Sequence, residues 1–226
     1  MVNRPAGGAR SKKWERAPYD WYREGPKVVE QLIHGLAAHD CSFGDDLIWD
    51  PCCGAGNVLD VMKRYGHPTF GSDVVDRHPR HQFMRGNILT QIKRVPALAG
   101  RKTSAILNPP YSYEPDIAER IIERLLEFEG LHRVAAIVPI AFLASMERWS
   151  KTRLLRRRPS HVGIYRERPT MPPGHLIHEM ERPYEGGMAD YCAVVFTAPH
   201  RWRTELVWLP PGTHPAAPRR HQTKEQ

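Results

Sequence analysis

Short apolar runs alternate along this chain with segments whose apolar residues recur every three or four positions. Such runs are typical of strands covered on both faces, and the periodic segments are typical of helices with one buried face. The predicted strands lie near residues 46–49, 69–72, 82–84, 104–107, 134–138, 161–166 and 191–196. The predicted helices begin near residues 26, 57, 115 and 146. This alternation indicates an α/β fold: a seven-stranded, mostly parallel sheet with an antiparallel last strand and helices on both faces.

The first predicted strand runs directly into a glycine-bearing turn, Asp50-Pro51-Cys52-Cys53-Gly54-Ala55-Gly56, and a helix follows. Small residues in such a turn let a ligand approach the backbone, as in nucleotide-binding α/β folds. The next strand ends in Asp73, 19 residues after Gly54 (73 − 54). An acidic residue about 20 positions downstream is where such folds bind a ribose hydroxyl pair. Asp73 is therefore the candidate ribose ligand, and Asp76 is the alternative.

A second turn follows the strand predicted at 104–107 and reads Asn108-Pro109-Pro110-Tyr111. Neither proline has an N–H, and each restrains the residue before it, so the strand ends there. Asn108 and the Pro109 carbonyl can accept the two hydrogens of a planar amino group, and Tyr111 can stack on the ring that bears it. The alternative is a proline-rich turn that Asn108 caps and that binds no ligand.

The net charge of +8 indicates a polyanionic partner, and the position of the charge matters more than its size. Residues 1–17 hold five basic and one acidic residue, and residues 147–168 hold eight basic and two acidic residues. A basic helix predicted near 146–157 and the residue after it supply the candidate phosphate contacts, which are Arg148, Lys151, Arg153, Arg156, Arg157 and Arg158. The alternative is a solvated helix face without a ligand.

A length of 226 residues with 41% hydrophobic content fits one globular domain with short tails. Residues 1–18 and 210–226 are polar and aperiodic, so we expect disordered tails around a domain at 19–209. The amino terminus lacks the apolar block of a signal peptide, and no apolar run is long enough to span a bilayer. The four cysteines lack the spacing of a zinc site or a disulfide framework. We expect a cytoplasmic protein without a metal, as a monomer or weak dimer.

The motifs together resemble a known family. Asp-Pro-Cys-Cys-Gly-Ala-Gly at 50–56, Asp73, Gly-Asn-Ile-Leu at 86–89 and Asn-Pro-Pro-Tyr at 108–111 resemble those of the class I S-adenosylmethionine-dependent methyltransferases. Within them, the match is to the adenine-N6 DNA methyltransferases of the compact bacteriophage type, and it covers about residues 19–209 in element order. The resemblance implies a Rossmann-like fold, S-adenosylmethionine as cofactor, DNA as substrate, and methyl transfer to the adenine N6 amine in a bacterial or phage-infected cytoplasm.

By position, the resemblance implies a role for each motif. The turn beneath the methionine part of the cofactor would be formed by Asp50, Pro51, Cys52, Gly54 and Gly56. Asp73 would bind the ribose hydroxyls, and Asn87, where the family usually has Asp, would reach the adenine amino group of the cofactor. Tyr22 lies in a segment that resembles the amino-terminal cofactor motif, with Gly25-Pro26 in place of Thr-Pro. The catalytic turn would consist of Asn108, Pro109, Pro110 and Tyr111.

Other substrates and a non-enzymatic role stay open. An adenine in RNA or a glutamine side chain of a protein presents the same planar amine to the turn. A catalytically idle module that binds nucleic acid with the same fold is the third alternative. The loop at 169–187 is the segment available for target recognition, so we expect a relaxed or very short target sequence.

Overall fold

The predicted strands assemble into one sheet in the computed structural model, which describes residues 17–78, 80–144, 158–187, 189–199 and 203–211. Its strands are β1 (Leu47–Asp50), β2 (Thr69–Asp73), β3 (Gln82–Arg85), β4 (Thr103–Leu107), β5 (Leu131–Pro139), β6 (His161–Tyr165), β7 (Tyr191–Thr197) and β8 (Glu205–Leu209). The α-helices of the described residues are α1 (Pro26–Ala37), α2 (Asn57–Arg64) and α3 (Ile117–Leu126). Short 3-10 helices occur at η1 (Pro18–Asp20), η2 (Pro96–Leu98), η3 (Ile140–Leu143) and η4 (Ile177–Glu179).

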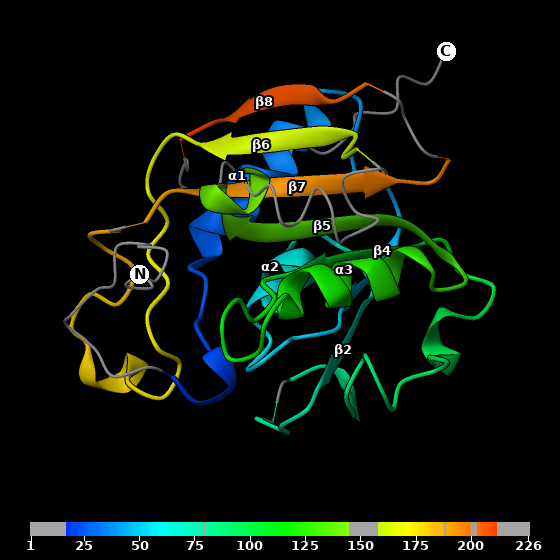
Figure 1. The fold of residues 1–226 in the computed structure, drawn as a ribbon, viewed down its shortest axis with the longest axis horizontal. Helices are drawn as coiled ribbons and strands as arrows, with labels where there is room; N and C mark the ends of the chain where they lie inside the picture. The colour runs from blue at the N-terminus through cyan, green and yellow to red at the C-terminus, as the bar shows by residue number, and fades with distance from the viewer. Residues whose placement is uncertain (1–16, 79, 145–157, 188, 200–202, 212–226) are drawn as a thin grey trace, which may run out of the picture.

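The sheet has the strand order β3-β2-β1-β4-β5-β7-β6-β8 (Figure 1). Strands β1 to β5 are parallel to one another, and β7 is antiparallel to both of its neighbours. The chain leaves β1 toward β2 on one side and later returns to β4 on the other side. The carboxyl ends of β1 and β4 therefore lie where open α/β sheets bind ligands. The predicted α/β, Rossmann-like fold is confirmed, including the antiparallel strand at 191–197.

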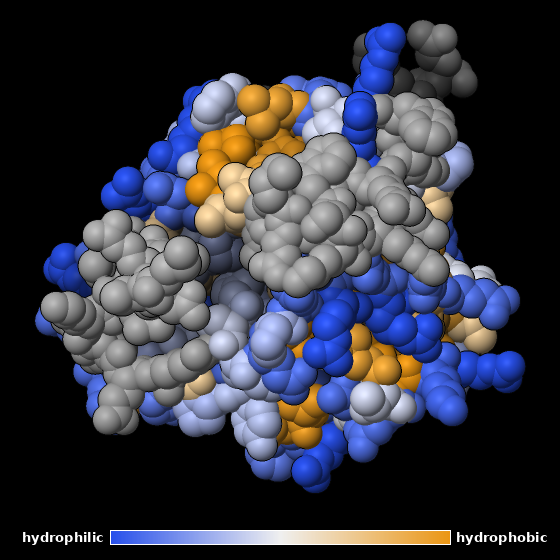
Figure 2. All heavy atoms as spheres, in the orientation of Figure 1, coloured by the Kyte–Doolittle hydropathy of each residue, from blue (hydrophilic) through white to orange (hydrophobic). Residues whose placement is uncertain are grey.

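The sheet has one strand more than the predicted seven. Strand β8 pairs in parallel with β6 at the edge of the sheet. Only its alternate residues Val207 and Leu209 are buried, whereas Leu206 and Trp208 are 55% and 57% exposed. Figure 2 shows an apolar patch over this edge, near β8 and β6. The sequence did not predict β8, because a short strand that is buried on one face has a weaker apolar pattern than strands that are buried on both faces.

The helices cover both faces of the sheet, as predicted (Figure 1). Side chains alternate along each strand, so one face of β1 and β4 carries Ile48 and Ile106, which pack in the core against α1 and α2. The other face carries Trp49 and Leu107, which pack in the core against α3. These two buried layers fix the strand ends that carry the functional turns.

Some predictions lie outside the described residues. The basic helix predicted near 146–157 does, and so do most residues of both predicted tails; Ala17 is described and buried, and Pro18 begins η1. Among the described residues, no helix combines the length and the apolar character that a bilayer crossing requires.

Candidate functional site

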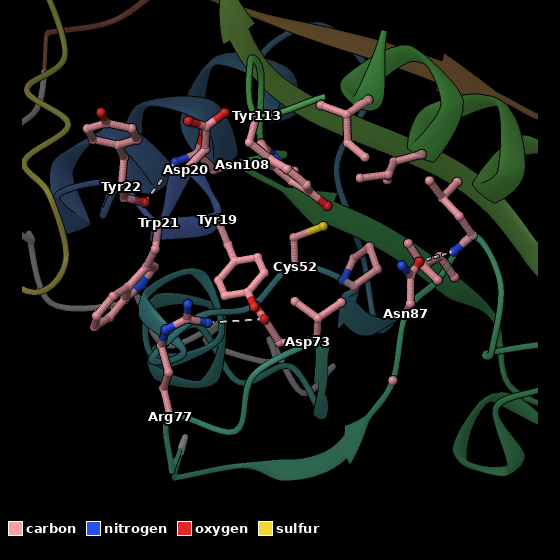
Figure 3. Close-up of a pocket in the computed structure, with 18 residues that line it drawn as sticks. Tyr19, Asp20, Trp21, Tyr22, Cys52, Asp73, Arg77, Asn87, Asn108 and Tyr113 are labelled. Atoms are coloured by element: carbon pink, nitrogen blue, oxygen red, sulfur yellow. Dashed lines mark hydrogen bonds and ion pairs between the residues drawn. The ribbon is translucent and has the colours of Figure 1, made fainter. Parts of the chain in front are cut away.

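A pocket opens at the carboxyl ends of the parallel strands. It holds about 600 Å³ of empty space, including its open mouth. Its walls come from the segment before α1, the turn after β1, the ends of β2 and β3, the turn after β4, and α3 (Figure 3). The predicted residues that line it are Tyr22, Pro51, Cys52, Asp73, Asn87, Asn108 and Pro110. The structure therefore brings the glycine turn and the Asn-Pro-Pro-Tyr turn to one shared pocket.

The turn after β1 is held by its own acidic residue. Asp50 is buried, and its Oδ1 accepts a hydrogen bond from the Cys52 N–H at 3.0 Å. Burial, and then the charge of nearby Glu24, raises the pKa of Asp50 well above its usual value. Gly54 and Gly56 have φ of +52° and +90°, which a side chain would strain. Asp50, Gly54 and Gly56 fix the shape of the turn but do not line the pocket. Pro51 and Cys52 of the same turn line it.

Asp73 lies at the end of β2 and is already engaged by the protein. Its Oδ2 accepts from the Gly54 N–H at 2.8 Å, and its Oδ1 accepts from the Val75 N–H at 3.0 Å. The same Oδ1 accepts from Arg77 at 3.1 Å (Figure 3). A carboxylate offers about four acceptor positions, so about one stays available for a hydroxyl group. A ribose diol that used two positions would compete with Arg77.

Asn87 lies on the opposite side of the pocket in Figure 3 from Trp21 and Arg77. Its Oδ1 accepts from the Leu89 N–H at 2.8 Å, and its own N–H donates to Gln91 Oε1 at 2.8 Å. This arrangement fixes the loop after β3. These bonds do not use the amide nitrogen of Asn87. That nitrogen is a hydrogen-bond donor, whereas the Asp usual at this position in the adenine-N6 methyltransferases has only acceptors.

The amide of Asn108 is held at both ends. Its Nδ2 donates to Glu24 Oε2 at 3.1 Å and to the Tyr22 carbonyl at 3.3 Å, and it lies 3.9 Å from Met171 Sδ. Because the groups around it are acceptors, the nitrogen must be the end that faces them. The opposite end, Oδ1, accepts from the Tyr111 hydroxyl.

Tyr111 is turned into the protein. Its hydroxyl is also 2.8 Å from the Ile137 carbonyl of β5, and its ring lies 6.3 Å from that of Tyr191. Burial, together with the charges of its neighbours, raises the pKa of Tyr111 well above its usual value. In this position the ring supports Asn108 from behind. The stacking role predicted for it stays a prediction that requires the ring to turn toward a substrate.

Two functional candidates were missed, and both lie before α1. The Oδ2 atom of Asp20 accepts from the Tyr111 N–H at 3.2 Å and from the Ser112 N–H at 2.6 Å. These are the first two N–H groups after the double proline, so one carboxylate fixes the Asn-Pro-Pro-Tyr turn. Glu24 contacts Asn108, as described above. No short-range motif marks either residue, since each acts on a turn far along the chain.

Trp21 lines the pocket beside the glycine turn. A Cβ atom built on Gly54 would lie 2.7 Å from the indole Nε1, and one built on Gly174 would lie 2.3 Å from the indole ring. The ring is therefore enclosed by two glycines, and Arg77 stacks on it at 4.4 Å. The Gly174 N–H donates to the Trp21 carbonyl at 2.8 Å. The predicted recognition loop at 169–187 is thus fastened to this wall at its start.

The predicted phosphate contacts lie mostly outside the part of the chain that the structure describes. Five of them, Arg148, Lys151, Arg153, Arg156 and Arg157, lie outside the described residues. Arg158 is described and exposed.

Solved structures of other proteins share the fold of this chain. No protein-family model matches the chain, and no curated protein matches it. A candidate RNA methyltransferase from Pyrococcus horikoshii superposes with a TM-score of 0.56 at 13% identity, covering 79% of this chain and 87% of that one. A candidate class I S-adenosylmethionine-dependent methyltransferase from Listeria monocytogenes superposes with a TM-score of 0.52 at 13% identity, covering 79% of this chain. The fold is that of the class I methyltransferases.

The likeness covers 79% of this chain and concerns the fold alone. This chain spans 62% of the length of the Listeria protein. Identities of 13% are too low to transfer a substrate, and one fold serves many functions. The chemistry of the pocket, and not the fold, therefore carries the information about function.

Proposed function

We propose that this chain is an S-adenosylmethionine-dependent methyltransferase that modifies the exocyclic N6 amine of adenine in DNA. The observation that carries the proposal is the shared pocket. Pro51 and Cys52 of the glycine turn line the same pocket as Asn108 of the second turn. A methyl donor at the first turn and an amine at the second would then meet within one cavity. Positioning two reactants in this way is a large part of catalysis.

The residues present fit the cofactor. Asp73 supplies an acceptor for a hydroxyl group, and Val74 and Ile88 give apolar walls suited to a purine ring. The Asp73 carboxylate, which Arg77 partly balances, favours a cationic ligand near the glycine turn. When bound, S-adenosylmethionine supplies a methyl group on a positively charged sulfur.

Asn108 and Pro109 would act on the amine. The lone pair of an adenine N6 amine is delocalised into the ring, so its nitrogen is a weak nucleophile. One lone pair of Asn108 Oδ1 accepts the Tyr111 hydrogen, and the other is available to the amine. The carbonyl of the next residue, Pro109, would be the second acceptor. Hydrogen bonds to both acceptors would draw the amine toward tetrahedral geometry and restore its lone pair. The proton can leave after methyl transfer, so no base must remove it first.

The choice of DNA rests on the resemblance of the motifs to bacteriophage adenine-N6 enzymes, supported by the basic residues at 147–168. A target base in a duplex must be turned out of the stack, at a cost of a few kcal/mol that contacts to phosphate must offset. An adenine in RNA or a protein glutamine presents the same amine, and both are outcomes of the experiment below.

The test is methyl transfer from labelled S-adenosylmethionine to unmethylated DNA, to RNA and to protein, followed by identification of the modified nucleoside or residue. N6-methyladenine in DNA is the expected product. Asn108→Ala should keep cofactor binding and lose transfer. Glu114→Gln is the matched control, because Glu114 is exposed near the turn and pairs only with Arg120 among the described residues. Cofactor binding by the wild type without transfer to any acceptor would identify an idle module.

A further inference from the structure

The buried carboxyl of Glu24 contacts the amide of Asn108 from outside the pocket. Glu24 is 6% exposed and does not line the cavity, yet its Oε2 accepts from Asn108 Nδ2 at 3.1 Å. Its main chain is fixed as well, because the Glu24 carbonyl accepts from Asn57 Nδ2 at 2.9 Å. The neighbouring Arg23 donates to Asn57 Oδ1 at 2.7 and 3.0 Å, so its guanidinium is held by an amide rather than by this carboxylate.

The surroundings of Glu24 place its titration in the physiological range. Burial raises the pKa of Glu24 to about 7, although its own N–H, the Asn108 amide, the charge of Arg23 and the Val58 N–H act in the opposite direction. The other titratable groups that interact with it are Asp50, Tyr111 and Tyr165. Both ionisation states of Glu24 are therefore populated near neutral pH.

We propose that Glu24 is a positioning residue for methyl transfer, which holds the Asn108 amide with Oδ1 directed to the target amine. This inference rests on the function proposed above. A free amide can turn over and present its NH2 group to the amine, donor against donor. A carboxylate at Nδ2 prevents this, since an ionised acceptor makes the stronger hydrogen bond. The same bond polarises the amide and makes Oδ1 a better acceptor.

The experiment measures single-turnover transfer to adenine at saturating cofactor, from about pH 5.5 to about pH 9. The carboxylate form of Glu24 is lost as the pH falls through about 7, so the wild-type rate should fall below that pH. Glu24→Gln keeps an acceptor oxygen but no charge. We expect its rate to be about tenfold lower at high pH and to lack this pH dependence, with unchanged cofactor affinity.

Two further variants separate position from charge. Glu24→Asp keeps the charge but is one methylene shorter, so it should lose rate and still show a pH dependence. Glu30→Gln is the matched control: Glu30 is a buried acid of α1 that pairs with Arg64 at 3.0 Å and has no contact with the turn. It should transfer at the wild-type rate with the wild-type pH profile.

Each outcome decides the proposal. A Glu24→Gln variant with the wild-type rate and pH profile overturns the role of Glu24 and leaves the methyltransferase proposal standing. If Asp50→Asn abolishes the pH dependence and Glu24→Gln retains it, the titrating group is Asp50 and the role of Glu24 is again overturned. A wild-type protein that methylates no adenine overturns both. If Glu24→Gln fails to fold, Glu24→Asp carries the test, and a wild-type rate in that variant refutes the positioning role.

Discussion

Asp20 should control the geometry of the Asn-Pro-Pro-Tyr turn, and with it the proposed methyl transfer, more strongly than it controls the stability of the fold. Its Oδ2 accepts from the N–H groups of Tyr111 and Ser112 and lies 3.2 Å from the Ser112 hydroxyl. Replacement by Ala leaves the half-buried Tyr111 N–H without this acceptor, whereas the exposed Ser112 can bond to water. Hydrogen bonds to charged groups contribute about 1.5–3 kcal/mol. We therefore expect Asp20→Ala to lower the free energy of unfolding by about 2–3 kcal/mol, which is roughly 4–12 °C in Tm.

A series at this position separates stability from activity. Asp20 has a φ of +52°, a left-handed conformation that costs a residue other than glycine roughly 1–2 kcal/mol. Asp20→Gly relieves that strain but supplies no carboxylate, so it should be about 1 kcal/mol more stable than Asp20→Ala and equally poor in transfer. Asp20→Asn keeps one acceptor oxygen and tolerates this φ, so it should lie closest to the wild type.

The assays are thermal unfolding followed by circular dichroism and single-turnover methyl transfer at saturating cofactor. A loss of alignment in the turn should slow transfer on the order of a hundredfold in the Ala and Gly variants. Wild-type transfer by Asp20→Ala, or transfer that tracks Tm across the series, would refute the claim that this carboxylate sets the geometry of the turn.

Three further predictions concern other parts of the structure. Asp73→Asn should weaken cofactor binding by roughly 10- to 100-fold in calorimetry, because a charge-assisted acceptor becomes a neutral amide. Although burial raises the pKa of Asp46, the His132 imidazole 3.1 Å away and the hydrogen bond from Ser104 hold that pKa below its usual value. The ionised Asp46 stabilises the folded protein above about pH 4, which is near the pKa of an Asp in the unfolded chain. This stabilisation is lost as the pH falls through the lower pKa that Asp46 has in the folded protein, so Asp46→Asn should flatten the acid side of the plot of Tm against pH. Gly174→Ala should displace Trp21, lowering Tm and quenching or shifting tryptophan fluorescence; an unchanged spectrum would contradict the packing.

The sheet and the two turns were predictable because their signals are local. Strands β1 and β4 are buried throughout, and a proline-bearing turn follows each of them, so sequence order placed Asp50 and Asn108 at strand ends. Parallel pairing then brought those ends to one edge. Strand β8 was not predictable in the same way, since its burial depends on the edge of β6 and its pattern is short.

The supports of the site could not be predicted because their partners are distant in the chain. Glu24 and Asn108 are 84 positions apart, and Asp20 and Ser112 are 92 positions apart. An acidic residue before a helix reads locally as a solvated side chain. The inward position of Tyr111 was also invisible, since it depends on the carbonyl of Ile137 in a neighbouring strand. Sequence reasoning therefore named seven residues that line the pocket and missed Asp20 and Glu24, whose carboxyl groups contact the Asn-Pro-Pro-Tyr turn.

The segment at 19–24 links both turns, and its backbone indicates why it is there. Tyr19 and Asp20 both have positive φ, an unfavourable conformation for two consecutive residues with side chains. Such strain persists only where surrounding contacts determine the geometry, and here those contacts are the hydrogen bonds of Asp20 to the Asn-Pro-Pro-Tyr turn. Trp21 then covers Gly54, and Glu24 reaches Asn108. One short segment thus sets the positions of the predicted methyl-donor site and of the amide beside it, so substitutions within it should reduce methyl transfer well before they unfold the sheet.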